Sequence, residues 1–337
     1  MTDAPQPVPA FVVVRDTPAP PALRGAVIAI GNFDGVHRGH RTLIEAAQIR
    51  AREFGRPAAA LTFEPHPRTV LRPEQPFFRL SDEIMKLRLL AATGLAGAFI
   101  VCFDKALAHL PADAFVQDIL IDRLGVACAV IGYNFHFGNR REGTPQFLAA
   151  EGARRGFAVD ILPQLEDEGR PVSSQAVRAA LAGGRMVEAA ELLGFPWPIS
   201  GTVIHGDKRG RDLGYPTANI VPDPGCGLRH GIYAVRVGVA GRRYDGVASF
   251  GRRPMYRTDT PLLEVFLFDF SGDLYGETID VAFLAFIRDE MRFGSVETLV
   301  HRMDEDSRIA RAALARQPDA FPPLGDVRTA EQQASAG

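Results

Sequence analysis

The sequence of 337 residues lacks the features that mark secreted or membrane-spanning proteins. Its three cysteines are an odd number without paired spacing, and Cys102 and Cys128 lie in apolar runs while Cys226 lies in a glycine-rich loop. The first ten residues carry Asp3 and several prolines, not the basic start and apolar core of a secretory signal. The longest apolar stretch, residues 89–103, contains two glycines and is too short to cross a bilayer. We therefore expect reduced thiols and a cytoplasmic protein.

An excess of either charge is also missing. The 38 Lys and Arg residues against 40 Asp and Glu residues leave a net charge of -2, which gives no electrostatic case for binding nucleic acid or an acidic membrane. Neither a Walker-A loop nor a G-x-G-x-x-G fingerprint occurs, and His205, Cys226 and His230 lack the paired spacing of zinc ligands. The partners that we expect are small molecules, bound by a monomer or weak homo-oligomer.

The length predicts two domains, each large enough for its own core. In the first, short β-rich runs alternate with helical patterns, which predicts a parallel sheet. Ser81, Pro111 and the pair Thr144-Pro145 mark the starts of three of these helices. The expected strands are residues 27–30, 58–63, 98–103, 126–131 and 157–162.

Beyond residue 194 the pattern changes to strands joined by tight turns, at residues 231–240, 243–250, 262–270 and 277–287. Successive strands without helices between them predict an antiparallel sheet or small barrel. An amphipathic helix is expected at residues 295–314. The expected divisions are a loose tail at 1–14, domains at 15–187 and 188–318, and a disordered tail at 319–337.

The segment GNFDGVHRGH, residues 31–40, connects the first strand of the sheet to a helix. Its glycines Gly31, Gly35 and Gly39 let the backbone approach a ligand, and the helix N-terminus favours phosphate. His37 and His40 are three residues apart and share one face of the first turn. This arrangement suits nucleotidyl transfer by positioning and charge stabilisation. The alternative is a strand-to-helix turn with two solvated histidines.

A second candidate site lies in the later half. Residues 201–220 combine glycines and basic residues in a loop that can surround a polyphosphate, or can be a flexible basic hairpin. Thr217 and Asn219 offer oxygen ligands to Mg²⁺, although capping or turn chemistry is the alternative. Glu264 interrupts an apolar strand, and a carboxylate there is either a base or an outward-facing residue.

These motifs resemble one family. Residues 31–40, 62–68, 124–138 and 172–181 are similar to the adenylyltransferase module of bacterial bifunctional riboflavin kinase/FAD synthetases, and most of 198–295 is similar to their kinase module. The resemblance implies a Rossmann-like, parallel-sheet nucleotidyltransferase domain of the H-x-G-H type, followed by an antiparallel β-barrel riboflavin kinase domain with a C-terminal helix. It implies that riboflavin becomes FMN at the second site and that FMN becomes FAD at the first, with ATP and Mg²⁺.

The resemblance also assigns residues to the two sites. ATP at the adenylyltransferase site would contact Gly31, Asn32, Phe33, Asp34, Gly35, His37, Gly39, His40, Asn134, Ser174 and Arg178. The flavin there would lie beside Thr62, Phe63, Pro65 and His66. At the kinase site, ATP would contact Gly206, Lys208, Arg209 and Gly210, and Mg²⁺ would bind Thr217 and Asn219. Glu264 and Arg292 would lie at the flavin, and Glu264 would take the proton of the ribityl hydroxyl.

Some of these residues have a second interpretation or depart from the family. His66, between two prolines, equally suits a rigid turn, and Ser173 or Ser174 suits a helix N-cap. Positions at which the chain departs from the family pattern are Thr144, Gln175, Val177, Ser249 and Met255. They leave two alternatives open: a kinase whose N-terminal module is inactive or takes another substrate, and a flavin-binding sensor without turnover. Intact His37, His40, Thr217, Asn219 and Glu264 argue against the sensor.

Overall fold

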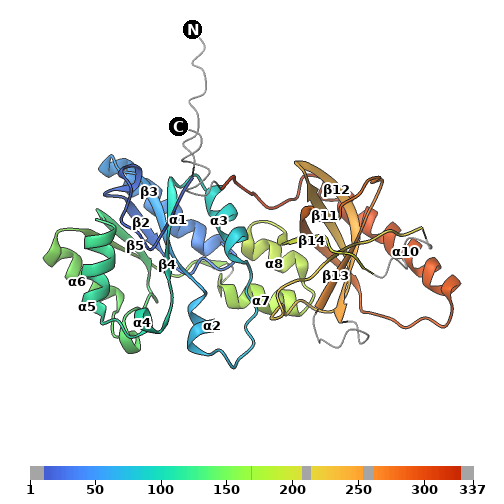
Figure 1. The fold of residues 1–337 in the computed structure, drawn as a ribbon, viewed down its shortest axis with the longest axis horizontal. Helices are drawn as coiled ribbons and strands as arrows, with labels where there is room; N and C mark the ends of the chain where they lie inside the picture. Colours follow the sequence, from blue (N-terminus) through green and yellow to red (C-terminus); the bar gives the residue numbers. More distant parts are fainter. Residues whose placement is uncertain (1–10, 168, 207–213, 253–260, 328–337) are drawn as a thin grey trace, which may run out of the picture. The chain divides into compact units, whose positions relative to one another are not determined.

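The structure is a computed structural model that describes residues 11–167, 169–206, 214–252 and 261–327. It contains two compact units, each described here by itself (Figure 1). The N-terminal unit comprises the chain up to Pro76, Asp82–Val172 and the segment from Leu324 on, and the C-terminal unit comprises Phe77–Ser81 and Ser173–Pro323. In the described part of the chain, no helix is long and apolar enough to span a membrane.

The N-terminal unit is built on a parallel sheet whose strands are apolar and buried. Each of the five strands expected from the sequence is confirmed to within two residues at both ends. Across the sheet the strands are β1 (Val12–Arg15), β4 (Gly97–Cys102), β3 (Ala58–Glu64), β2 (Val27–Ile30), β5 (Cys128–Gly132) and β6 (Ala158–Leu162). Helix α1 (Arg38–Phe54) packs on β2, β3 and β5 through Leu43, Ile44, Ala47 and Ala51.

The remaining elements of this unit are short. Its helices are α2 (Pro67–Leu71), α3 (Glu83–Ala91), α4 (Lys105–Ala108), α5 (Ala112–Ala114), a π-helix (Phe115–Arg123) and α6 (Pro145–Arg155), with 3-10 turns at Pro21–Leu23 and Asn139–Arg141. A small hairpin consists of β7 (Glu166–Asp167) and β8 (Arg170–Pro171).

Helix starts follow the sequence closely because side chains cap them. Asp82 accepts from the backbone of Met85 at the start of α3, one residue after the expected Ser81. Thr144 caps α6 with Pro145 in the first turn, as expected, so the threonine that departs from the family pattern has a structural role.

The described parts of both chain tails are more ordered than the sequence indicates. β1, expected to be part of a loose tail, pairs in parallel with β4 and buries Val14. Its three consecutive valines provide an apolar edge strand, which the surrounding prolines obscure in the sequence. Near the other end, Phe321 lies under the guanidinium of Arg243, so the stretch that follows α10 has defined contacts despite its composition.

The C-terminal unit is an antiparallel six-stranded sheet. Across the sheet its strands are β10 (Ala218–Ile220), β13 (Pro261–Leu267), β12 (Arg242–Arg252), β11 (Gly231–Val239), β14 (Thr278–Arg288) and β9 (Trp197–Thr202). A bridge between Ile204, just after β9, and Asn219 in β10 links the two edges, so the sheet curls into a barrel. Helix α10 (Val296–Ala315), capped by Ser295 as expected, packs on β11, β12 and β14 (Figure 1).

Helices α7 (Ser174–Ala182) and α8 (Met186–Leu193) belong to the C-terminal unit. The segment Phe77–Ser81 joins them there, because the Trp197 indole donates to the Leu80 carbonyl at 2.8 Å. The compact units therefore divide after Val172, fifteen residues before the functional boundary expected at 187.

Candidate active sites

The loop that follows β2 has an unusual backbone. Phe33 and Val36 have φ angles of 48° and 44°, in the left-handed region, and both side chains are fully buried. A bulky or β-branched residue in this region is strained, and such strain persists where the surroundings impose it, most often at functional sites. Gly35, with φ of 80°, takes the same region without strain. Asp34 is buried between them.

His37 ends this loop and begins α1. Its Nδ1 atom accepts from the backbone N–H of His40 at 3.3 Å, so His37 is the N-cap of the helix. The two imidazole rings stack with centroids 3.7 Å apart, and Phe33 packs edge-on against His40 at 5.2 Å. Because Nδ1 of His37 accepts, the proton of the neutral ring is on Nε2, which can donate to a ligand.

The structure keeps His40 neutral. Burial, the neighbouring His37 and the charge of Lys86, in that order, hold the pKa of His40 well below its ordinary value. Its Nδ1 atom is buried and, among the described residues, has no hydrogen-bond partner. A buried polar atom without a partner is costly, and a bound ligand that forms a hydrogen bond with this atom would remove the cost.

Gly39 permits the tight packing of the first turn. A side chain there would have its Cβ 3.2 Å from the His37 ring and 3.3 Å from the Val172 carbonyl oxygen. Next to it, Arg38 forms an ion pair with Asp167 of the β7–β8 hairpin. Gly31 has less need to be glycine, since its Cβ would make ordinary contact with Phe33.

The expected flavin loop follows the neighbouring strand, β3. Thr62, near the end of β3, is fully buried and donates its hydroxyl hydrogen to the Asn32 carbonyl at 3.1 Å. This bond joins the expected flavin loop, residues 62–67, to the loop at residues 31–40, which we call the nucleotide loop. His66, after the cis Glu64-Pro65 peptide, accepts from the Arg68 backbone at 3.1 Å and caps α2. The turn interpretation of His66 therefore has a physical basis. Lys86, whose buried side chain pairs with Glu64, was not predicted from the sequence.

The three other residues expected at ATP lie on separate elements. Asn134 is exposed in the turn after β5. Because β5 pairs with β2, this turn and the nucleotide loop follow adjacent strands. Ser174 begins α7 after its N-cap Ser173. Arg178 donates to the Phe78 carbonyl at 2.5 Å and lies over the Phe77 ring at 4.5 Å, both within the C-terminal unit.

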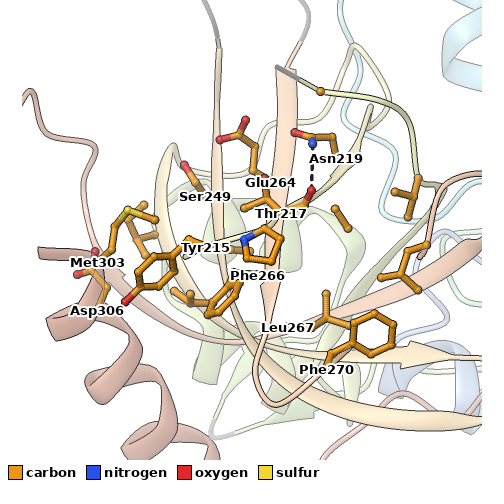
Figure 2. A pocket seen from close by; sticks show the side chains of 18 of the residues that line it. Tyr215, Thr217, Asn219, Ser249, Glu264, Phe266, Leu267, Phe270, Met303 and Asp306 are labelled. Atoms are coloured by element: carbon orange, nitrogen blue, oxygen red, sulfur yellow. Dashed lines mark hydrogen bonds between the residues drawn. The ribbon is translucent and has the colours of Figure 1, made fainter. Parts of the chain in front are cut away.

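A cavity of about 620 Å³ opens in the C-terminal unit, within the size range of small-molecule sites. Glu264 lies on its wall between two cross-strand neighbours, Asn219 on β10 and Ser249 on β12. Figure 2 shows these three side chains and Thr217 in one part of the cavity. Alternation along β13 buries Leu263 and Val265 and turns Glu264 toward the cavity, so the outward-facing alternative does not hold.

Thr217 and Asn219 are adjacent in space as well as in sequence. The Asn219 amide donates to the Thr217 carbonyl at 3.3 Å (Figure 2). Gly206 has to be glycine, because a Cβ there would lie 2.4 Å from the Asn219 amide nitrogen. The hydroxyl, the amide oxygen and the Glu264 carboxylate are hard oxygen donors of the kind that Mg²⁺ accepts together with phosphate and water. Lys208, Arg209 and Gly210 lie outside the described residues, as does Met255.

The other part of the cavity is aromatic. Tyr215 packs against Phe266 with ring centroids 4.7 Å apart, and Met303 and Asp306 of α10 lie beside them (Figure 2). The sequence predicted core positions for residues 266, 268 and 270. Phe268 is buried there, but Phe266 lines the cavity because it shares the face of β13 with Glu264, and Phe270 lines it after the backbone turns at Asp269 with φ of 57°.

Two charged residues of this part were not expected from the sequence. Arg288 at the end of β14 forms a two-pronged pair with Asp306, with distances of 2.6 and 2.9 Å. Arg288 lies in the stretch that resembles the kinase module, but neither residue was assigned a role there, and their proximity depends on how α10 packs. Arg292, expected at the flavin, is exposed between Met291 and Phe293, which both line the cavity.

Comparisons with known proteins agree with this division. Residues 19–176 match the family model described as FAD synthetase, and residues 193–314 match the one described as riboflavin kinase. Proteins named bifunctional riboflavin kinase/FMN adenylyltransferase from Pseudomonas fluorescens and Escherichia coli (strain K12) are 41% identical over 300 residues and 39% over 288. The alignments cover 88% and 85% of this chain, and 95% and 92% of the relatives.

Among solved structures, the chain is similar to a crystal structure described as a macrolide-efflux protein from Streptococcus pneumoniae. The TM-score is 0.80 at 32% sequence identity, and the match covers 89% of this chain and 99% of that chain. The two-unit architecture therefore occurs in a solved structure over nearly its whole length.

Proposed function

Because this chain belongs to the family of bifunctional riboflavin kinase/FMN adenylyltransferases, we propose that it makes FMN and then FAD at the two sites described above. The C-terminal unit phosphorylates riboflavin with ATP. The N-terminal unit joins the AMP moiety of a second ATP to FMN and releases pyrophosphate. The single observation that supports this most directly is the position of Glu264, in the cavity between Asn219 and Ser249.

In the kinase reaction, Glu264 accepts the proton of the ribityl 5′-hydroxyl as its oxygen attacks the γ-phosphorus of ATP. The bond to the β,γ-bridging oxygen breaks, and ADP leaves. Thr217 and Asn219 supply oxygen ligands for Mg²⁺, which when bound neutralises charge on the phosphates. Tyr215 and Phe266 provide an apolar wall for the flavin ring. Arg292 and the segment 289–293 are placed at the flavin by the family resemblance.

In the adenylyl transfer, a phosphate oxygen of FMN attacks the α-phosphorus of ATP, and pyrophosphate leaves. No protein nucleophile is required, so the residues act by orientation and by donating hydrogen bonds to the phosphoryl oxygens. His37 can donate from Nε2, and the N-terminus of α1 adds backbone N–H groups and a favourable dipole. Asn134, Ser174 and Arg178 remain proposed contacts of the triphosphate.

The positions that depart from the family pattern fit this proposal. Val177 is fully buried in α7, where isoleucine is usual in the family, so its role is packing. Gln175 is exposed one turn before Arg178 and keeps a polar side chain at its position. Ser249, beside Glu264, is still a hydrogen-bonding group although it replaces asparagine. These positions are expected to adjust affinity and to leave both reactions in place.

Three finer points belong to the proposal. The activities divide at residue 187, with the adenylyltransferase at 15–187 and the kinase at 188–318. Mg²⁺ is the metal of both reactions, since both transfer a phosphoryl or nucleotidyl group from ATP. The protein acts in the cytoplasm, where Cys102, Cys128 and Cys226, all free thiols in the structure, stay reduced.

The direct test is to incubate the purified protein with riboflavin, ATP and Mg²⁺ and to separate the products by chromatography. FMN followed by FAD is the expected result. FMN alone would indicate a kinase whose N-terminal unit is inactive or has another substrate. Absence of both products, with flavin bound, would indicate a sensor and would contradict the proposed function.

A further inference from the structure

Lys86 is a charged residue in an apolar setting. Its side chain is 1% exposed, on a helix whose neighbouring residues Met85, Leu87, Leu89 and Leu90 are buried. Lysine is almost never fully buried unless its ammonium is paired. Here Nζ lies 2.6 Å from Oε1 of Glu64, which is 5% exposed. The pair is therefore one of the most deeply buried charge pairs in the described part of the chain.

Stability does not account for such a pair. Desolvation of the two charges costs several kcal/mol each, and apolar residues of similar volume are often as stable or more so. The role of the pair therefore lies in the groups that it positions, and not in the free energy of unfolding. The contacts of Lys86 near the adenylyl-transfer site show which groups the pair holds in place.

The ammonium group contacts the strand end that leads into the flavin loop, and it is linked to the loop at residues 31–40 through Thr62. Beyond Glu64, it lies 3.4 Å from the Thr62 hydroxyl and 3.5 Å from the Phe63 carbonyl, both on β3. Thr62 gives its hydroxyl hydrogen to the Asn32 carbonyl, so it can accept from Lys86. One polar chain thus runs from Glu64 through Lys86 and Thr62 to Asn32. It connects the end of β3 with the loop that begins after β2.

The same charge reaches the histidine pair, because Lys86 is one of the groups that lower the pKa of His40. An ammonium within electrostatic range of His40 disfavours a second cation at that ring and favours an anionic ligand beside it. Because its side chain is 1% exposed, Lys86 itself is not placed to contact substrate.

We propose that Lys86 is a positioning residue for adenylyl transfer, which holds Glu64 and Thr62 and thereby fixes the flavin loop against the nucleotide loop at Asn32. This rests on the proposed function of the N-terminal unit. Since the rate of a positional mechanism depends on sub-ångström placement, loosening the two loops lowers kcat by about tenfold to about 100-fold. A purely structural pair would instead change only the stability of the unit.

The test uses the full chain with both charges removed, Lys86→Met together with Glu64→Gln, because Lys86→Met alone leaves a buried carboxylate uncompensated. We expect kcat for FAD formation from FMN to fall by about tenfold or more. Riboflavin phosphorylation by the same molecules should not change, and this second activity reports that the protein is intact. A kcat within about twofold of wild type, with only a lower melting temperature, would overturn the proposal.

Two further variants make the result specific. Thr62→Val keeps the ion pair and the shape of the side chain but breaks the link to Asn32, and we expect it to lower kcat as well; a wild-type kcat would overturn the proposed chain of contacts. Arg50→Met with Asp160→Asn removes a different ion pair of the same unit, at 2.6 Å, and should leave FAD formation unchanged. If wild-type protein makes no FAD from FMN, the proposed function fails before this inference is reached.

Discussion

His37 both caps helix α1 and stacks on His40, and one substitution can separate these roles. Asparagine is a strong N-cap residue but has no imidazole. His37→Asn should therefore change the free energy of unfolding by less than about 0.5 kcal/mol and lower FAD formation by about 100-fold or more. Denaturant unfolding and the FAD assay measure the two effects. His37→Asn with wild-type FAD formation would mean that the histidine serves only as a cap.

His40 makes the stability of the free protein depend on pH. Its pKa is lowered on folding, so below the pKa of the unfolded chain, about 6.5, the unfolded state binds the additional proton. Stability is then complete above that pH and falls on acidification, by up to about 1.4 kcal/mol per pH unit. His40→Asn should be less sensitive between about pH 7 and pH 5, measured by denaturant unfolding without nucleotide. An unchanged pH dependence in this variant would show that His40 is not the group responsible.

At this scale, sequence spacing is informative when a site is continuous in the chain. His37 and His40 lie together because they are three residues apart on a helix, and Thr217 and Asn219 are neighbours in the chain. Lys86 could not be predicted, because its partner Glu64 is on another element and nothing in its helical pattern distinguishes it from a surface lysine. The strain at Phe33 and Val36 is likewise visible only in the backbone.

Helix α10 forms one wall of the kinase cavity, since Leu299, Met303 and Asp306 line the cavity. Its C-terminal end is held by Arg236 of β11, whose side chain is 4% exposed. This guanidinium donates to the carbonyl of Leu314 in the last turn of α10 and to those of Gln317 and Ala320 just beyond it, and it also pairs with Asp245.

Arg236→Leu should lower the free energy of unfolding of the C-terminal unit by about 2–4 kcal/mol, because three carbonyls lose a charged donor and Asp245 loses its partner. It should also raise the KM for riboflavin as α10 loosens. Trp197 is the single tryptophan and lies buried in β9, so its fluorescence follows this unit. Arg311→Leu is the control, because Arg311 also lies on α10 but forms an exposed pair, with Asp269 after β13. It should lower the free energy of unfolding by about 1 kcal/mol or less. Equal losses in both variants would contradict the capping role.

Elements with a long, regular pattern were predictable from the sequence. The parallel strands are confirmed because each is a continuous apolar run, and the long antiparallel strands and α10 are confirmed because their apolar periodicity is uninterrupted. β10 has three residues, too few to show a period, and β9 contains Pro198, which only an edge strand tolerates. The predicted strand at residues 262–270 was too long, because the left-handed backbone at Asp269 is a turn that composition does not mark.

At the scale of the whole molecule, the fold class, parallel followed by antiparallel, could be predicted because each half has a distinct pattern of strands and helices. The position of α7 and α8 could not. These helices belong to the C-terminal unit together with the segment Phe77–Ser81, although Ser81 lies 93 residues before Ser174, the first residue of α7. Long-range packing of this kind leaves no local signal.

The central claim is that one chain carries two sites that work independently, and Glu264→Ala tests it most directly. The carboxylate is required only for removing the ribityl proton, so FMN formation from riboflavin should be lost while FAD formation from supplied FMN continues at the wild-type rate. Both are measured by chromatography on the same folded preparation. Loss of both reactions in a folded Glu264→Ala protein would contradict the account.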